Sequence, residues 1–209
     1  MTQSNQAVAA EHHVHRDDVG AKMGMWLFLF TEVLLFGGMF LAYAVYRFQY
    51  PEQFKLAALE LDTTMGTLNT IILLTSSLTM ALSILALQKR NKFFSIINLL
   101  LTIFFAFGFM INKYFEWSAK FSHGIYPGSE ELLNKQNGEI VFFGLYYIMT
   151  GLHGLHIIIG IVILTFMLVF LIRDSITHDN YVKLENSGLY WHLVDLIWIF
   201  LFPLFYLIH

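Results

Sequence analysis

Five long apolar runs constrain this chain more than any other feature of its sequence. They cover residues 23–46, 65–87, 93–111, 140–172 and 189–208. Only Glu32 and Asp195 are charged inside them. A helix of about 20 apolar residues spans the hydrocarbon of a bilayer and satisfies its own backbone polar groups. The pattern therefore predicts an all-α fold, a polytopic membrane bundle of five transmembrane helices. We expect residues 23–209 to form one membrane domain.

Composition excludes several other classes of protein. Hydrophobic residues make up 57% of the chain and charged residues only 13%, whereas a soluble domain carries about 25% charged residues. A net charge of −3 without any basic cluster argues against a nucleic-acid partner. The absence of cysteine excludes disulfides, thiolate catalysis and cysteine-ligated zinc. No phosphate-binding loop or nucleophile elbow occurs in the sequence.

Residues 1–22 form a polar N-terminal tail with His12, His13 and His15 close to Asp17. Such a group can hold a metal loosely, but a solvated tail is the favoured interpretation. The tail contains no apolar segment typical of a secretory signal peptide. We therefore expect the first span to act as its own insertion signal, which favours a bacterial inner membrane.

The basic linker at 89–92 indicates the orientation of the chain. It carries Lys89, Arg90 and Lys92 between the second and third runs. Short loops follow the positive-inside rule best. The N-terminus is thus predicted to be cytoplasmic and the C-terminus periplasmic.

Small polar residues follow one side of the second run. Asn69, Ser76, Thr79 and Ser83 fall together at 100° per residue. Such a stripe lets membrane helices approach and share hydrogen bonds. This side is therefore predicted to face protein.

Two groups of ionisable residues lie at the depth of the membrane in the first and fourth runs. Glu32 is close to the middle of its span, where desolvation favours the neutral acid or a pair with a cation, lipid headgroup or water. His153 and His156 are three residues apart and share one helix face. They could ligate a metal or haem, or act as hydrogen-bonding groups, and spacing alone leaves both open.

The last run begins after Glu185 and contains Trp191, His192 and Asp195. The i,i+3 spacing lets the carboxylate of Asp195 orient the imidazole of His192. Trp191 and its neighbour Tyr190 suit a membrane interface, where amphipathic rings anchor. No further ligand set for a metal is evident here.

The chain resembles subunit III of the haem-copper respiratory oxidases, which include cytochrome c oxidases and quinol oxidases. Five segments in colinear order carry the resemblance, at 24–36, 68–70, 113–117, 150–160 and 190–198. The Gly-Leu-His-Gly-Leu-His and Trp-His-Leu-Val-Asp sequences are the most specific. The seven-span members have two further N-terminal helices forming one arm of a lipid cleft, so this sequence is similar to the five-span bacterial form. Another subunit is then expected to supply the other wall of the cleft.

The resemblance implies a cofactor-free, non-catalytic accessory subunit without its own redox centre. Haem and copper are expected in partner subunits. The partners implied are subunit I by direct packing, subunit II, a small subunit IV and bound phospholipid. The role implied is support of proton uptake and catalytic lifetime during the reduction of oxygen to water. The sequence around Glu32 and at 191–195 favours cytochrome c as the electron donor. The alternative is the same subunit of a quinol oxidase.

The resemblance also assigns roles to individual residues. Glu32 matches the family's buried, carbodiimide-reactive glutamate, and His156 matches a histidine near a lipid headgroup. Glu185, His192 and Asp195 match polar positions of the last helix. Arg173 is a candidate headgroup partner, displaced by about one helical turn from the family's arginine.

Two other classes of function compete with this interpretation. A membrane metalloprotein or bis-histidine haem carrier would use His153, His156 and His192, but the family uses these histidines without metal. A transporter would use Glu32 as a proton relay. Helices broken by proline or glycine at corresponding positions of two repeated halves would favour a transporter. The sequence has one proline inside a span, Pro203 near the C-terminus, and so lacks that pattern.

Overall fold

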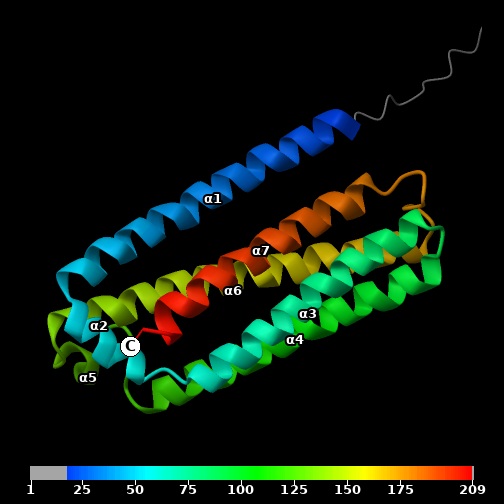
Figure 1. Cartoon of the computed structure of the whole chain (residues 1–209). Coiled ribbons are helices and arrows are strands. Elements are labelled where there is room, and N and C mark those ends of the chain that lie inside the picture. The colour runs from blue at the N-terminus through cyan, green and yellow to red at the C-terminus, as the bar shows by residue number, and fades with distance from the viewer. Residues whose placement is uncertain (1–17, 209) are drawn as a thin grey trace, which may run out of the picture.

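The structure, a computed structural model, describes residues 18–208, and seven helices occur in that part of the chain (Figure 1). They are α1 (Asp18–Gln49), α2 (Pro51–Leu59), α3 (Thr63–Gln88), α4 (Lys92–Ser122), α5 (Glu130–Leu133), α6 (Asn137–Ile172) and α7 (Val182–Tyr206). Five of them, α1, α3, α4, α6 and α7, are long and apolar enough to cross a membrane. The predicted all-α fold with five transmembrane helices is confirmed.

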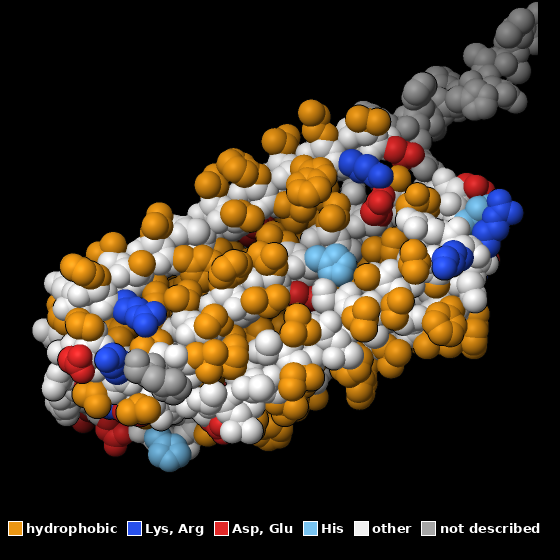
Figure 2. All heavy atoms as spheres, viewed as in Figure 1, with side chains coloured by type: hydrophobic (Ala, Val, Ile, Leu, Met, Phe, Trp, Pro, Cys, Tyr) orange, Lys and Arg blue, Asp and Glu red, His pale blue; other side chains and the backbone are white. Residues whose placement is uncertain are grey.

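The five long helices run side by side between two ends of the molecule. One end, which we call the turn end, holds the start of α1, the α3–α4 turn and the α6–α7 loop (Figure 1). The opposite end, the α2/α5 end, holds the two short helices and the end of α7. Hydrophobic side chains cover most of the visible side, and charged side chains gather mainly towards the two ends (Figure 2). This distribution is what a membrane-spanning bundle requires.

The bounds of several helices differ from the sequence prediction. Helix α4 continues to Ser122 instead of ending at Ile111, and α7 begins at Val182 instead of Leu189. The segment between α4 and α6 is therefore shorter than the interval between the third and fourth apolar runs, and it contains the short helix α5. Pro51 begins α2, because a residue without an N–H fits the first helical turn.

Side-chain caps set the starts of three helices. The Asp62 carboxylate accepts hydrogen bonds from the backbone N–H groups of Thr64 and Met65 at 2.8 and 3.2 Å. Asn91 and Ser129 cap α4 and α5 in the same way. These caps satisfy donors that a helix start leaves free, and they let the chain reverse direction within a few residues.

The polar stripe of α3 packs against α4. Asn69, Ser76, Thr79 and Ser83 are all buried. The hydroxyl groups of Thr79 and Thr102 are 2.8 Å apart, and those of Ser83 and Ser95 are 3.1 Å apart. The prediction that this side of the second span faces protein is confirmed.

Helices α6 and α7 approach closely at Gly160. A Cβ atom built on this glycine would lie 2.6 Å from the ring of Trp191, so only a glycine leaves room for the indole. Trp191 is fully buried, and its neighbour Tyr190 is almost so. The prediction that these two rings anchor at the membrane interface is wrong, because they fill the α6–α7 contact instead.

Helix α1 lies on the outside of the other four long helices (Figure 1). Its buried residues are Leu29, Phe36 and Tyr43, spaced seven apart along one narrow stripe. The hydroxyl of Tyr43 donates to the backbone oxygen of Leu204 in α7. Most other large apolar residues of α1 are exposed, so this helix offers a wide surface to lipid or to another chain. The histidines predicted in the N-terminal tail lie outside the described residues, and the single-domain assignment stays a prediction.

Candidate functional site

Glu32 of α1 and His156 of α6 meet near the middle of their helices. The carboxylate oxygen Oε2 lies 2.9 Å from the ring nitrogen Nε2, and both side chains are largely buried. The sequence places these residues 124 positions apart. This pair answers the question that the sequence left open for Glu32, since its partner is a histidine of the same chain.

The surroundings of His156 determine how many protons the pair holds. Its other nitrogen, Nδ1, is 2.8 Å from the backbone oxygen of Leu152. A carbonyl oxygen only accepts, so Nδ1 carries a proton. A hydrogen bond between Nε2 and Glu32 then needs one further proton, on either the acid or the ring. The pair is therefore neutral overall, which suits its position in the membrane.

A hollow of about 380 Å³ opens beside this pair, between α1, α6 and α7. Its walls are formed by Met25, Phe28, Glu32, His156, Ile159, Ile163, Asn186, Ser187 and Tyr190. Towards the turn end, Lys22 and Glu185 form an ion pair of 2.8 Å. The wall of the hollow is mainly apolar, and this ion pair lies next to it, since Glu185 directly precedes Asn186 of the wall.

A second hollow of about 590 Å³ lies at the opposite end of α1. It is lined by Phe40, Tyr43, Ala44, Arg47, Phe48, Pro51, Lys55, Leu204 and Ile208. Both of its cations are exposed. The contact between α1 and the rest of the bundle therefore carries one hollow towards each end of the molecule.

Four polar side chains form a buried network inside the bundle near the α2/α5 end. The Lys113 ammonium donates to Glu116 Oε2 at 3.1 Å and to the hydroxyl of Tyr206 at 2.7 Å. The hydroxyl groups of Tyr146 and Tyr206 donate to Glu116 Oε1. Sequence reasoning missed this network, because it ended the third span before Lys113. The i,i+3 spacing of Lys113 and Glu116 was the available signal.

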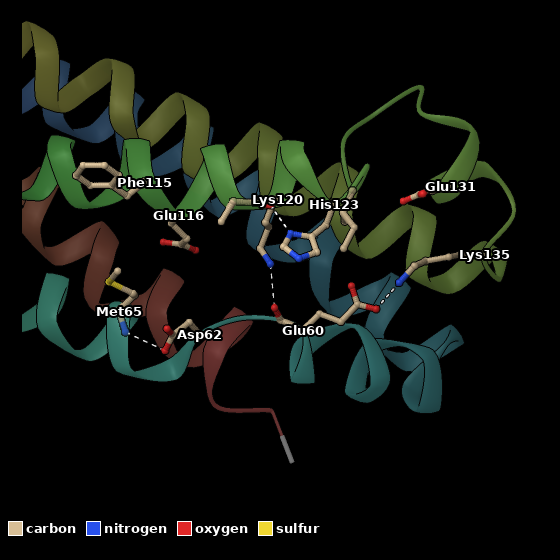
Figure 3. A pocket seen from close by; sticks show the side chains of 11 residues that line it. Glu60, Asp62, Met65, Phe115, Glu116, Lys120, His123, Glu131 and Lys135 are labelled. Atoms are coloured by element: carbon tan, nitrogen blue, oxygen red, sulfur yellow. Dashed lines mark hydrogen bonds and ion pairs between the residues drawn. The ribbon is translucent and has the colours of Figure 1, made fainter.

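A hollow of about 550 Å³ leads from the α2/α5 end to this network, and Glu116 lies in its wall (Figure 3). Figure 3 shows Lys120 and Lys135 reaching towards Glu60 from different elements. Lys120 donates to the backbone oxygen of Glu60 at 2.9 Å, and Lys135 pairs with its carboxylate. Acidic residues outnumber lysines in the lining. These contacts tie the α2–α3 loop to α4 and to the α5–α6 segment.

Lys135 lies outside the membrane-spanning helices, and its surroundings favour the charged form. Partial burial acts to lower the pKa of Lys135, but the hydrogen bond and the charge of Glu60, together with Glu139, outweigh this effect. The pKa is therefore raised above its ordinary value. Glu139 completes the group at 3.4 Å.

The two histidines of the fourth span lie in different surroundings. His153 is fully buried, and its ring contacts those of Trp198 and Phe109 at centroid distances of 5.3 and 5.6 Å. Neither of its nitrogens has a hydrogen-bond partner among the described residues. His156 instead pairs with Glu32. Within residues 18–208 no group of three or more His, Cys, Asp or Glu side chains is placed to hold a metal ion.

The polar residues of the last helix are not joined as predicted. His192 Nδ1 lies 2.6 Å from the hydroxyl of Ser77 in α3, so Asp195 does not orient this ring. Asp195 is buried, and its oxygens make no regular hydrogen bond within the described residues, although Ser77 is near. Trp191 donates to Ser76 at 3.1 Å.

The remaining predicted residues lie at the turn end. Glu185 pairs with Lys22 beside the hollow, as described above. Arg173 ends α6, where its backbone N–H donates to Val169, and its side chain is exposed.

Comparison with known proteins identifies the family. The model of the family "Cytochrome c oxidase subunit III" matches residues 3–209. The chain is 33% identical to a haem-copper oxidase subunit I+III of Aeropyrum pernix, over 90% of this chain and 22% of that one. It is 42% identical to a cytochrome c oxidase subunit 3 of Yarrowia lipolytica, over 66% of this chain and 47% of that one. It therefore spans less than half the length of these two relatives.

A third relative matches over nearly its whole length. It is a probable quinol oxidase subunit 3 of Staphylococcus saprophyticus, 27% identical over 98% of this chain and 96% of that one. Relatives of both donor types thus share this sequence pattern. With the family model covering almost every residue, the chain belongs to the cytochrome c oxidase subunit III family of haem-copper oxidases.

Proposed function

We propose that this chain is the non-catalytic subunit III of a haem-copper terminal oxidase. In this role it packs against subunit I, binds phospholipid and supports proton uptake and the catalytic lifetime of oxygen reduction. Haem and copper lie in the partner subunits. Membership of the family supports the proposal. In residues 18–208, no three or more His, Cys, Asp or Glu side chains are grouped to hold a metal, which agrees with it.

The observation that carries the lipid-binding part is the neutral Glu32–His156 pair beside an apolar hollow. An acyl chain fits between Phe28, Ile159 and Ile163. A headgroup would lie at the turn end, within reach of Lys22 and of neighbouring polar groups. Arg173, exposed at the same end, is the further headgroup partner we propose. His153, Trp191 and Asp195 are core residues that do not line this hollow.

Partners and location belong to the same proposal. The Aeropyrum pernix relative carries subunits I and III in one chain, which supports direct packing of this chain on subunit I. Subunit II and a small subunit IV are the further partners we propose. The complex lies in a bacterial inner membrane, with the turn end cytoplasmic. We propose cytochrome c as donor, and quinol is the alternative because a probable quinol oxidase subunit matches over nearly its whole length.

Removal of the subunit tests this proposal in the whole complex. Without the chain, we expect haem content and initial oxygen uptake to stay largely intact. Turnover is then expected to decay faster during the assay, more steeply at high pH, where protons are scarce. The measurement is oxygen uptake against time at two pH values, with and without the subunit. Loss of all activity at time zero, in a fully haem-loaded complex, would show that this chain takes part in the chemistry.

A filled hollow tests lipid binding separately. Ile163→Trp places an indole in the cavity, and Ile158→Trp places one on an exposed part of the same helix. We expect the first variant to lose phospholipid from the purified complex and to show the faster decay. The second variant is the matched control. Equal phospholipid content in both, measured by mass spectrometry, would contradict the assignment of this hollow.

A further inference from the structure

One outer face of the bundle carries a polar pair among apolar residues. This α3/α7 face is formed by Leu74, Ser77, Leu78, His192, Leu196 and Ile199. Leu74, Leu78, Leu196 and Ile199 are between 44 and 59% exposed. Ser77 and His192 are partly exposed between them.

The polar pair lies at the depth of the hydrocarbon. His192 follows Val182 by ten residues and precedes Tyr206 by fourteen. At a rise of about 1.5 Å per residue, it is about 15 Å from one end of α7 and about 21 Å from the other. Ser77 lies at a similar distance from both ends of α3. Neither headgroups nor bulk water reach this depth.

The hydrogen bond between these two residues leaves one group of His192 without a partner. Nδ1 shares a hydrogen bond with the Ser77 hydroxyl. Within residues 18–208, Nε2 makes none. A polar group that faces hydrocarbon is costly, so such groups are rare unless another protein segment meets them. By contrast, the Glu32–His156 pair is satisfied inside this chain.

The outer surface of the neighbouring helix α4 is different. Thr102 of α4 bonds Thr79, which sets this part of α4 close to the depth of Ser77. Its outward residues there include Leu101 and Phe104, which are 40 and 69% exposed. Lipid chains cover such a surface without leaving any hydrogen bond unmade.

We infer that the α3/α7 face is the surface on which a transmembrane helix of the catalytic subunit docks. That helix presents a hydrogen-bonding side chain, a hydroxyl or an amide, to Nε2 of His192. Its apolar residues pack between Leu78 and Leu196. The inference rests on the proposed function, and it names which face of this chain subunit I covers.

Cross-linking in the assembled complex tests the location. A photo-reactive phenylalanine analogue is placed at Leu78, at Leu196 and, as the lipid-facing control, at Phe104. We expect adducts with subunit I from the first two positions and none from the third. Co-purification of the chain with adducts from Phe104 alone would overturn the docking face while leaving the proposed function intact. A chain that does not co-purify with subunit I would contradict the proposed function itself.

Two isosteric substitutions of His192 test the hydrogen bond. A glutamine amide reaches the place of Nε2, and an asparagine amide reaches that of Nδ1. We expect His192→Leu and His192→Asn to lower the fraction of this chain retained on subunit I in detergent about threefold or more, the size of an average intramembrane hydrogen bond. His192→Gln is expected to retain it. The amount of each variant in membranes before extraction controls for folding.

The opposite result has a distinct meaning. If His192→Asn retains the chain and His192→Gln does not, the histidine serves only to hold α3 to α7 through Ser77. Retention of His192→Leu at the wild-type level would also overturn the inference. Thr31→Val is the control, because this exposed hydroxyl lies on α1, away from the α3/α7 face, and donates its proton to the backbone oxygen of Phe28.

Discussion

At the scale of single residues, the Glu32–His156 pair gives a sharp expectation for substitution. A glutamine at position 32 has an amide that donates to His156 Nε2 as a neutral acid does, so Glu32→Gln should accumulate in membranes close to the wild-type level. Glu32→Lys introduces a charge that costs about 2.5–3.5 kcal/mol at the centre of a span, so its level should fall. The measurement is the amount of chain in membranes and in the purified complex.

The same pair of variants can contradict the neutral assignment. If Glu32→Gln accumulates as poorly as Glu32→Lys, the carboxylate charge itself is needed, and a neutral hydrogen bond from an amide cannot replace it. An infrared carboxyl band provides a second measurement. A neutral acid at Glu32, or an imidazolium at His156, agrees with the structure, and a carboxylate beside a neutral ring does not.

The buried Lys113–Glu116 network predicts non-additive effects. Lys113→Met leaves the Glu116 carboxylate buried with two tyrosine hydroxyl groups and without a cation. Breaking a buried pair in this way costs about 3–5 kcal/mol. We expect the double variant Lys113→Met, Glu116→Gln to be less destabilised than the single Lys113→Met variant. Denaturant titration of the complex measures the difference, with the exposed Lys55→Met as control.

Strict additivity of the two substitutions would contradict the coupling. It would mean that the two charges do not sense each other, although Nζ and Oε2 are 3.1 Å apart. The sequence shows why this network is hard to predict. Lys113 and Glu116 are charged, and a charged segment after an apolar run normally marks its exit from the membrane. Their partners, Tyr146 and Tyr206, are about 30 and 90 residues further along the chain.

At the scale of helices, the α6–α7 contact depends on one missing side chain. In Gly160→Ala the new methyl group meets the rigid ring of Trp191, so the helices must move apart, and overpacking of this kind costs about 1–3 kcal/mol. Gly154→Ala is the matched control on the same helix, since nothing lies within 4 Å of its added Cβ. Thermal unfolding of the complex measures both variants.

A lower midpoint for Gly160→Ala and an unchanged or higher one for Gly154→Ala is the expected pattern. Equal midpoints would mean that α6 and α7 are not in the described contact. Periodicity correctly predicted the polar stripe of α3. Periodicity could not show which glycine of α6 allows the close contact with α7, because that depends on where the ring of Trp191 lies in the folded bundle.

Periodicity also explains which side-chain contacts sequence reasoning got wrong. It suggests partners within one helix, such as Asp195 for His192, because i,i+3 neighbours share a face. The structure joins His192 to Ser77, 115 residues away. Contacts between helices depend on how each helix is rotated in the bundle, which a single sequence does not state.

At the scale of the whole molecule, the separation of its two ends predicts a protease pattern. The 89–92 linker lies at the turn end, and the segments 50–62 and 123–136 lie at the α2/α5 end. Because the turn end is proposed to be cytoplasmic, protease added outside spheroplasts should cut at the latter two segments and spare the linker. Disrupted membranes, in which all three become accessible, are the control. Cleavage of the linker alone in intact spheroplasts would reverse the orientation.

The late arrival of His156 has a consequence for biogenesis. Glu32 leaves the ribosome 124 residues before the histidine that completes its hydrogen bond. At about 5–20 residues per second, that interval lasts about 6–25 seconds. During this interval Glu32 lies in the bilayer without its partner, because the helices that α1 packs against, α6 and α7, have not yet been made. A chain arrested before position 156 is therefore expected to be degraded faster than one arrested after Tyr206, and the Glu32→Leu variant is expected to remove much of that difference.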